Sequence, residues 1–324
     1  MPAEVLRHLR CPLCAEPLTA PARPAGPAQP AGGPGPLRCA RGHSFDQARQ
    51  GYVNLATGRV AHTGDTTEMV VAREEFLGAG HYDFISTALA TAATEAIAAT
   101  EARVVTEAGA TAAEAGAAAE ATGAPAAAGR LLAYAPFVVD AGAGTGRHLA
   151  AVLDAVPTSA GLALDVSKPA LRRAARAHPR AGAASCDTWG PLPLEDGSVS
   201  VLLNVFAPRN GAEFRRVLRP DGTLLVVTPA ADHLVELVDR LDLLRIEPGK
   251  AGRVANSLAG HFELAALGAY RRRLGLTRPQ VRTLVGMGPS AWHADPDRLA
   301  RRLADLPEPI QTTASVRVTA YRPG

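Results

Sequence analysis

The amino-acid sequence predicts a doubly wound α/β domain preceded by a small, cysteine-containing N-terminal module. Short runs of Val and Leu recur between residues 137 and 228, with helix-like segments between them. A glycine-rich turn follows the first of these runs, and three of the four cysteines lie within the first 39 residues. Fully apolar strands that alternate with helices are typical of a parallel sheet covered on both faces.

The predicted elements of the sheet follow from these runs. Strands are expected at 137–140, 161–165, 199–206 and 223–228, and helices at 146–155, 168–177, 211–218 and 231–244. Pro220-Asp221-Gly222 is expected to form the turn before the fourth strand, because Pro, Asp and Gly favour turns. The alternating segment 313–322 is expected to form an antiparallel edge strand.

Composition divides the chain into three parts. Residues 1–56 form the N-terminal module, which contains a Pro/Ala/Gly run from Thr19 to Pro36 that reads as a loop. Residues 57–130 form a helical linker, with helical periodicity at 65–100 and an Ala-rich insertion at 93–130 that reads as a spacer. Residues 131–324 form the α/β domain.

Bulk properties exclude little but point to an intracellular protein. The 324 residues carry a net charge of +3 and a pI of about 8.8, which permits a nucleic-acid partner without demanding one. No signal peptide and no apolar run long enough to span a bilayer is apparent, so a cytoplasmic location without a membrane partner is expected.

The cysteine cluster predicts a structural zinc site. A C-x-x-C pair and a C-x-x-x-H pair supply three thiolates and one imidazole, which complete a tetrahedral zinc site and leave no position for a catalytic water. The ligands would be Cys11, Cys14, Cys39 and His43. Cys186 stands apart and is expected to be a small core residue.

The glycine turn, DAGAGTG from Asp140 to Gly146, predicts a ligand site at a helix N-terminus. The dinucleotide pattern G-x-G-x-x-G fails in both registers, and no Lys follows as a phosphate loop requires. The pattern that remains, an acid followed by x-G-x-G-x-G, resembles the first motif of class I S-adenosylmethionine (SAM)-dependent methyltransferases. The fold class is therefore a Rossmann-like methyltransferase domain, with Asp140, Gly142, Gly144, Thr145 and Gly146 around the cofactor.

Two further acids fit the same cofactor. Asp165 ends the second predicted strand, where an acid can accept both ribose hydroxyls. Asp187 follows a further strand that is expected between those at 161–165 and 199–206, and it resembles the acid that meets the adenine amino group. The phrases LPLEDGSVSVLL (192–203) and RRVLRPDGTLLVV (215–227) also resemble this methyltransferase class.

A more specific resemblance lies in the first 85 residues. Three segments in this order are similar to the RlmA-type 23S rRNA guanine-N1 methyltransferases. They are CPLC with CARGHSFDQARQGYVNLA (within 11–56), GDTTEMVVAREEFLGAGHYDFI (64–85) and the glycine turn. That family includes the macrolide (tylosin) resistance methyltransferases of actinomycetes. The resemblance covers most of the chain except the loop at 19–36 and the insertion at 93–130.

The resemblance implies an enzyme that methylates N1 of a guanine in a 23S rRNA hairpin near the peptide exit tunnel, with a link to macrolide resistance. It implies a homodimer, an N-terminal zinc domain that helps to recognise the hairpin, and no DNA partner. It also implies cofactor contacts from Tyr82, Gly144, Thr145 and His233.

The substrate pocket is expected after the strand at 199–206. A base in a stem-loop must leave its stack to reach the sulfonium; Phe206 could stack on it and Asn204 could bind its edge, although both could equally be strand-end packing residues. No general base is identified. RNA contacts are expected from arginines of the zinc module, namely Arg7, Arg10, Arg38, Arg41 and Arg49.

Two alternatives remain open from the sequence. The first is a SAM-dependent methyltransferase for a small molecule such as a quinone or an antibiotic, which the glycine turn alone does not exclude. The second is a zinc-ribbon RNA-binding protein with no enzymatic activity. The zinc module opposes the first, and the intact glycine turn with Asp165 opposes the second.

Overall fold

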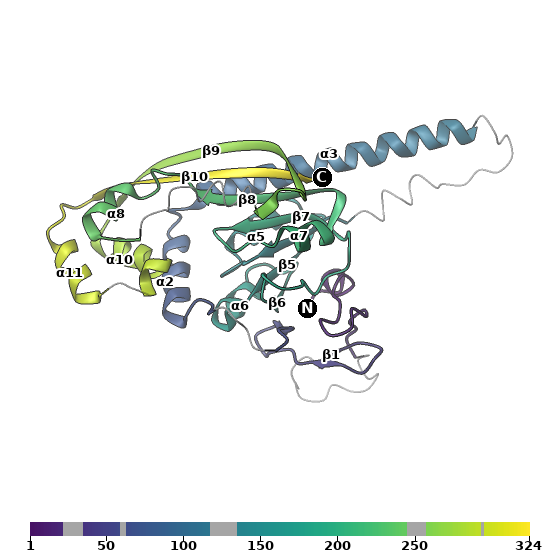
Figure 1. Ribbon diagram of the computed structural model, residues 1–324, viewed down its shortest axis with the longest axis horizontal. Helices are drawn as coiled ribbons and strands as arrows, with labels where there is room; N and C mark the ends of the chain where they lie inside the picture. The colour runs from purple at the N-terminus through teal and green to yellow at the C-terminus, as the bar shows by residue number, and fades with distance from the viewer. Residues whose placement is uncertain (22–34, 59–62, 117–134, 245–256, 293–294) are drawn as a thin grey trace.

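The computed structural model describes residues 1–21, 35–58, 63–116, 135–244, 257–292 and 295–324. Residues 22–34 of the expected loop at 19–36, and the insertion from residue 117 onward, lie outside the described residues. The centre of the molecule is an eight-stranded sheet in the order β3-β6-β5-β4-β7-β8-β10-β9 (Figure 1). Its strands are β3 Val53–Asn54, β4 Phe137–Ala141, β5 Ala160–Asp165, β6 Ala181–Ser185, β7 Val199–Val205, β8 Leu218–Pro229, β9 Phe262–Leu276 and β10 Ile310–Pro323.

The predicted parallel core is confirmed, and the position predicted for the C-terminal strand is wrong. Strands β3 to β8 pair in parallel, with β4 and β7 adjacent at the point where the strand order reverses. Strand β10 is antiparallel as expected, but it lies between β8 and β9 rather than at an edge. The edge strand on this side of the sheet is β9, whose residues are mostly exposed and lack the apolar pattern of a buried strand.

The expected turn at Pro220-Asp221-Gly222 is also absent. These residues lie within β8, where the pairing with β7 shifts register between Val199 and Val201. Val199 pairs with Leu218 and Val201 with Thr223, so the Pro-Asp-Gly sequence is absorbed as an irregularity of the strand. A side chain on Gly222 would meet the carbonyl oxygen of Val199 at 3.0 Å, which explains why glycine stands there.

Helices cover one face of the sheet. The core on this face contains residues of α2 (Thr67–Gly78), α3 (Asp83–Gly116), α5 (Arg147–Ala155), α6 (Lys168–Ala174), α8 (Val235–Leu241), α10 (Arg278–Gly286) and α11 (Pro296–Ala304). Helix α3 is a continuous helix that includes residues 93–116 of the Ala-rich insertion and extends away from the sheet (Figure 1). Helix α8 is shorter than the expected 231–244 because both of its capping residues, Leu234 and Asp242, have positive φ.

The N-terminal module covers much of the opposite face. Val5, Leu9 and Leu37 share a buried core with Phe137 and Val139 of β4. This core also includes residues of α7 (Gly211–Val217). From the module, α1 (Ala3–Leu6), β1 (Leu37–Arg38) and β2 (Ser44–Phe45) each contribute a buried side chain to it. Strand β3 extends the main sheet by pairing with β6. The module is therefore packed as an integral layer of the molecule.

Polar contacts fasten the same module to the sheet. The Ser185 hydroxyl accepts hydrogen bonds from the Leu55 and Ala56 N–H groups at 3.1 and 3.2 Å. The Arg10 guanidinium forms an ion pair with Glu195 at 2.6 Å, and the His8 ring stacks on Phe137 at 4.3 Å between centroids. None of the described helices combines the length and the apolar character needed to cross a bilayer.

Candidate functional site

The glycine turn connects β4 to α5 and requires small residues. Gly142, Gly144 and Gly146 all have positive φ, a conformation that side-chain-bearing residues rarely adopt. A Cβ on Gly142 would lie 2.4 Å from the Cβ of Ala207, which follows β7. The turn can therefore pack closely against the end of β7.

Asp140 is the buried acid of this cleft. Its side chain is 1% exposed, and neither carboxylate oxygen has a hydrogen-bond partner among the described residues. Burial, and then the charge of Asp165, raises the pKa of Asp140 to about 8. A buried carboxyl group without a partner is costly, so its retention indicates a cationic or hydrogen-bond-donating ligand.

Asp165 and Asp187 lie along the same cleft, beside the ends of β5 and β6. The two oxygens of Asp165 accept N–H groups from Gly144 and Ser167, each at 2.8 Å. This carboxylate thus holds the glycine turn against β5 and keeps acceptor capacity for a further donor. Asp187 accepts the Trp189 N–H at 3.1 Å and lines the cleft together with Thr188.

Tyr82 and His233 meet although 151 residues separate them in the chain. The Tyr82 hydroxyl lies 3.3 Å from His233 Nε2, and His233 Nδ1 accepts the Ser315 N–H at 3.1 Å. Because Nδ1 is an acceptor, the neutral ring carries its proton on Nε2 and donates it to Tyr82. The Tyr82 hydroxyl hydrogen is then available to a ligand, and burial raises the pKa of Tyr82 so that it stays protonated.

Phe206 and Asn204 occupy different environments. Phe206 directly follows β7 with a positive φ of 53°, is 42% exposed, and lies 6.1 Å from the His233 ring. Asn204 is fully buried, and its Nδ2 donates to the carbonyls of Ala141 and Pro208. Asn204 thus ties the β4 end to the loop after β7, whereas Phe206 presents a ring at the mouth of the cleft.

The four expected metal ligands converge in the N-terminal module. Their ligand atoms all lie within 4.8 Å of one another. His43 Nδ1 is 3.5, 3.4 and 3.4 Å from the Sγ atoms of Cys11, Cys14 and Cys39. The Cys14 and Cys39 Sγ atoms are 3.7 Å apart. A tetrahedral zinc ion with ordinary bond lengths requires about 3.6 Å between N and S and about 3.8 Å between sulfurs, so the residues fit zinc.

The cleft fits SAM on its own geometry. The glycine cradle admits a ligand close to the backbone, and the unpartnered Asp140 carboxyl suits the α-ammonium group of the cofactor. Asp165 and Asp187 line the cleft and offer carboxylate oxygens as acceptors to a ligand. The predicted Thr145 also lines the cleft near Asp140 and Tyr82. The residues present therefore fit a structural zinc ion at the cysteine cluster and a SAM cofactor in the cleft.

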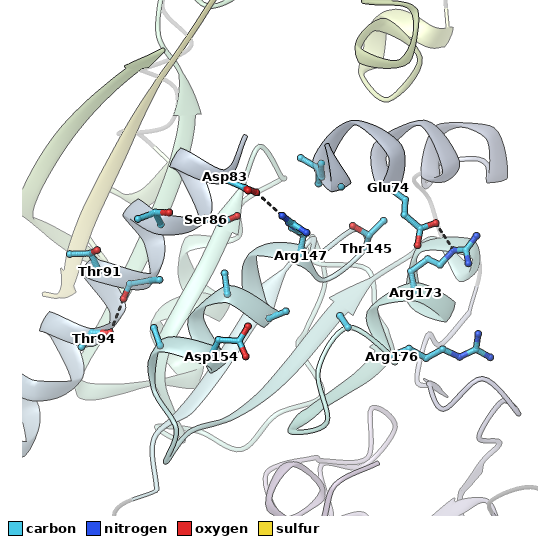
Figure 2. A pocket seen from close by; sticks show the side chains of 18 of the residues that line it. Glu74, Asp83, Ser86, Thr91, Thr94, Thr145, Arg147, Asp154, Arg173 and Arg176 are labelled. Carbon is cyan, nitrogen blue, oxygen red and sulfur yellow. Dashed lines mark hydrogen bonds and ion pairs between the residues drawn. The ribbon is translucent and has the colours of Figure 1, made fainter. Parts of the chain in front are cut away.

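A separate and larger hollow lies on the outer side of α5. It is bounded by α2, α3, α5 and α6, and Figure 2 shows Arg147 pointing toward Asp83 and Arg173 toward Glu74 across it. Thr145 borders both this hollow and the cleft. The predicted cofactor-binding acids Asp140 and Asp165 do not line it, so the size of the hollow does not identify the cofactor site.

Sequence reasoning missed Arg73 and Trp189. Arg73 belongs to α2 and lines the cleft over the glycine turn, but a charge within a helix is usually a solvated surface group. Trp189 is 50% exposed at the cleft next to Asp187. Arg73 lies in the segment GDTTEMVVAREEF, which indicates only the family resemblance. That resemblance assigns no role to Arg73.

Comparison with known proteins agrees with both parts of the site. Residues 9–56 match the zinc-ribbon family described as RlmA, N-terminal, and residues 138–222 match a methyltransferase domain family. A Micromonospora griseorubida protein, provisionally named as a 23S rRNA (guanine-N1)-methyltransferase, is 63% identical over 100% of both chains. The 23S rRNA (guanine(748)-N1)-methyltransferase of Streptomyces fradiae is 48% identical over 100% of this chain and 99% of its own.

A third relative is more distant. A Bacillus subtilis protein with the same provisional name is 28% identical over 90% of this chain and 89% of its own. The similarity to the Micromonospora and Streptomyces proteins spans the full length of this chain, and so covers the N-terminal module, the linker and the α/β domain. The chain belongs to the RlmA-type family of 23S rRNA (guanine-N1)-methyltransferases.

Proposed function

We propose that this protein methylates N1 of one guanine in 23S rRNA, at the position that corresponds to nucleotide 748, the target named for the Streptomyces fradiae relative. The observation that carries the proposal is the placement of an exposed aromatic ring, Phe206, at the mouth of the Asp140–Asp165 cleft. A flipped base can lie on that ring within reach of the cofactor. The cofactor, when bound, supplies an electrophilic methyl group on its sulfonium.

The residues of the cleft orient the donor. Asp140 would hold its ammonium group, Asp165 its ribose hydroxyls and Asp187 its adenine amino group. The hydroxyl of Tyr82, polarised by His233, donates a hydrogen bond into the same space. With the cofactor held by these residues, Phe206 at the mouth of the same cleft would hold the target base beside it.

Positioning contributes more to this reaction than proton transfer. Holding two reactants in line can supply roughly 7–11 kcal/mol. A general base typically adds about 10²–10⁴-fold in rate, which corresponds to about 3–5 kcal/mol. The proton of guanine N1 must still leave during the reaction. The arrangement of Phe206 and the glycine turn is nevertheless expected to dominate the rate.

The zinc module supplies the surface for the RNA. Arg7, Arg38, Arg41 and Arg49 are exposed on it, whereas Arg10 is used in the ion pair with Glu195. Because the module packs on the sheet that carries the cleft, RNA held by these arginines is held in a fixed position relative to Phe206. We also propose that the active form is a homodimer, as the resemblance implies, which light scattering of the purified protein tests.

Primer extension tests the proposed target. A methyl group on guanine N1 blocks the Watson–Crick edge, so reverse transcriptase stops one nucleotide before the modified base. Protein-free 23S rRNA from a strain without this modification, incubated with the enzyme and SAM, should give a single new stop at the base that corresponds to 748. A transcript with adenine at that base should give none. A stop elsewhere, or methylation of small acceptors only, would reject the proposal.

The same modification is proposed to confer macrolide resistance. Expression of the protein in a susceptible host should raise the inhibitory concentration of a tylosin-type macrolide, and an Asp140→Ala variant should not. Equal susceptibility of hosts with fully methylated and unmethylated rRNA would contradict this part of the proposal while leaving the methylation itself intact.

A further inference from the structure

Arg73 occupies the junction between the linker, the glycine turn and the β9–β10 connection. It belongs to α2, and its Nη2 forms an ion pair with Asp65 at 2.6 Å and donates to the Met287 carbonyl at 2.9 Å. Asp65 lies immediately before the N-cap of α2, and Met287 is the C-cap of α10. The guanidinium thus joins three chain segments at the edge of the cleft.

The other face of the same guanidinium lies over the glycine turn. The position that a Cβ on Gly144 would take is 3.6 Å from Arg73 Nη1 and 3.9 Å from Nε. Nε is buried and has no hydrogen-bond partner among the described residues. The recorded polar contacts of Arg73 all use Nη2, so its remaining donors are available next to the turn that receives the cofactor.

The charges of the cleft make this cation significant. The methionine end of SAM carries a carboxylate as well as an ammonium group, and the described cleft is lined by Asp140, Asp165 and Asp187. A carboxylate that enters among acids needs a cation close by. The orphaned Asp140 suits the ammonium group but would repel the carboxylate.

The other basic side chains along the cleft are less suited to this role. Arg147 is paired with Asp83 at 2.6 Å, on the side of the outer hollow (Figure 2). His148 is buried with its Nδ1 2.9 Å from the Ser86 hydroxyl, and burial lowers the pKa of His148 to about 4, so it is neutral. Arg73 is the cation that combines uncommitted donors with a position over Gly144.

We propose that Arg73 binds the α-carboxylate of SAM, opposite Asp140, and so fixes the amino-acid end of the cofactor between two side chains of opposite charge. This inference rests on the proposed function only in taking SAM as the ligand. Because the same guanidinium holds Asp65 and Met287, cofactor binding also secures the start of α2 and the end of α10 around the cleft.

Binding of two ligands to the holoprotein with zinc isolates this contact. The first is S-adenosylhomocysteine, the demethylated product, and the second is its decarboxylated analogue, which keeps the amine and lacks only the carboxylate. Wild-type protein should prefer the product by about tenfold to a hundredfold, the effect of one charge-assisted hydrogen-bond pair. In Arg73→Met this preference should disappear, with affinity for the decarboxylated analogue changed by less than about threefold. Arg73→Lys should keep part of it.

A matched control is Arg173→Met. Arg173 contacts the neighbouring residue of α2, Glu74, at 3.2 Å, and it lines the outer hollow rather than the cleft. This variant should keep the wild-type preference. Arg73→Met binding that is weakened equally for both ligands would show a merely structural role and overturn the inference. Wild-type protein that bound neither ligand would instead contradict the proposed function itself.

Discussion

The buried carboxyl group of Asp140 suits a cationic ligand, and in the ligand-free protein it makes the free energy of unfolding depend on pH. Burial, and then Asp165, raises the pKa of this group from 3.8 to about 8. An acid with a raised folded-state pKa holds its proton more tightly in the folded than in the unfolded chain. Its contribution to the free energy of unfolding therefore falls as the pH rises from about 4 to about 8.

We expect Asp140→Asn to remove this part of the pH dependence. The ligand-free variant should melt several degrees above wild type at about pH 8 and differ little at about pH 4, because the neutral amide avoids a buried charge. Its affinity for S-adenosylhomocysteine should fall by about tenfold or more. Asp154→Asn, at an acid of α5 whose side chain is 74% exposed, is the control. Melting curves with the wild-type pH dependence would contradict this assignment.

Phe206 is expected to act on the RNA base and not on the cofactor. Loss of one base-stacking ring costs about 1–3 kcal/mol, so Phe206→Ala should lower the single-turnover rate of methyl transfer by about fivefold to a hundredfold. Affinity for S-adenosylhomocysteine should stay within about twofold of wild type. Phe206→Tyr, which keeps a ring, should retain most of the rate. A full rate in Phe206→Ala would reject the placement of the base.

At the scale of elements, the zinc module is expected to depend on its metal while the cofactor cleft does not. Cys14→Ser removes one ligand of the cluster, so the purified protein should contain much less than one zinc per chain by atomic emission. Its melting temperature and RNA affinity should fall, because the module's apolar residues share a core with the sheet. Cys186→Ala, at a buried cysteine outside the cluster, should keep its zinc. Full zinc content in Cys14→Ser would contradict the ligand set.

The elements differ in how far the sequence could predict them. The strands around the glycine turn were predictable because full burial makes each a continuous apolar run, such as FVVDA in β4. Strand β9 was not, because its residues are mostly exposed and show no period of two. The interior place of β10 depends on that missed neighbour. No local pattern specifies which strand lies beside it.

In the site, too, residues that lie close together in the sequence were predictable, and residues that meet only in the folded chain were not. The cysteine ligands and the glycine turn lie on short stretches of chain, so their spacing alone predicts them. The meeting of Tyr82 with His233 followed only from the family resemblance. The position of Arg73 over Gly144 required the structure, since it depends on how α2 packs across the sheet.

In the whole molecule, the exposed arginines of the zinc module and the cofactor cleft belong to one packed unit, because the module packs on the sheet whose strand ends line the cleft. If the zinc module holds RNA through phosphates, the affinity for the target hairpin should fall steeply with salt, with a slope of about −0.7 per phosphate contact in single-stranded regions. Replacing Arg38, Arg41 and Arg49 with Gln should reduce that slope by about two units. Arg301→Gln, on α11 far along the chain from the module, should not change it. A flat salt response of the wild-type protein would exclude this surface.

Identification of the modified nucleoside tests the central claim most directly. Ribosomal RNA incubated with the enzyme and SAM, digested to nucleosides and separated by liquid chromatography with mass spectrometry, should yield 1-methylguanosine that is absent without the enzyme. Omission of SAM should abolish it. Methyl groups on another atom of guanine, on another base, or on no nucleoside at all would contradict the reaction assigned to this cleft.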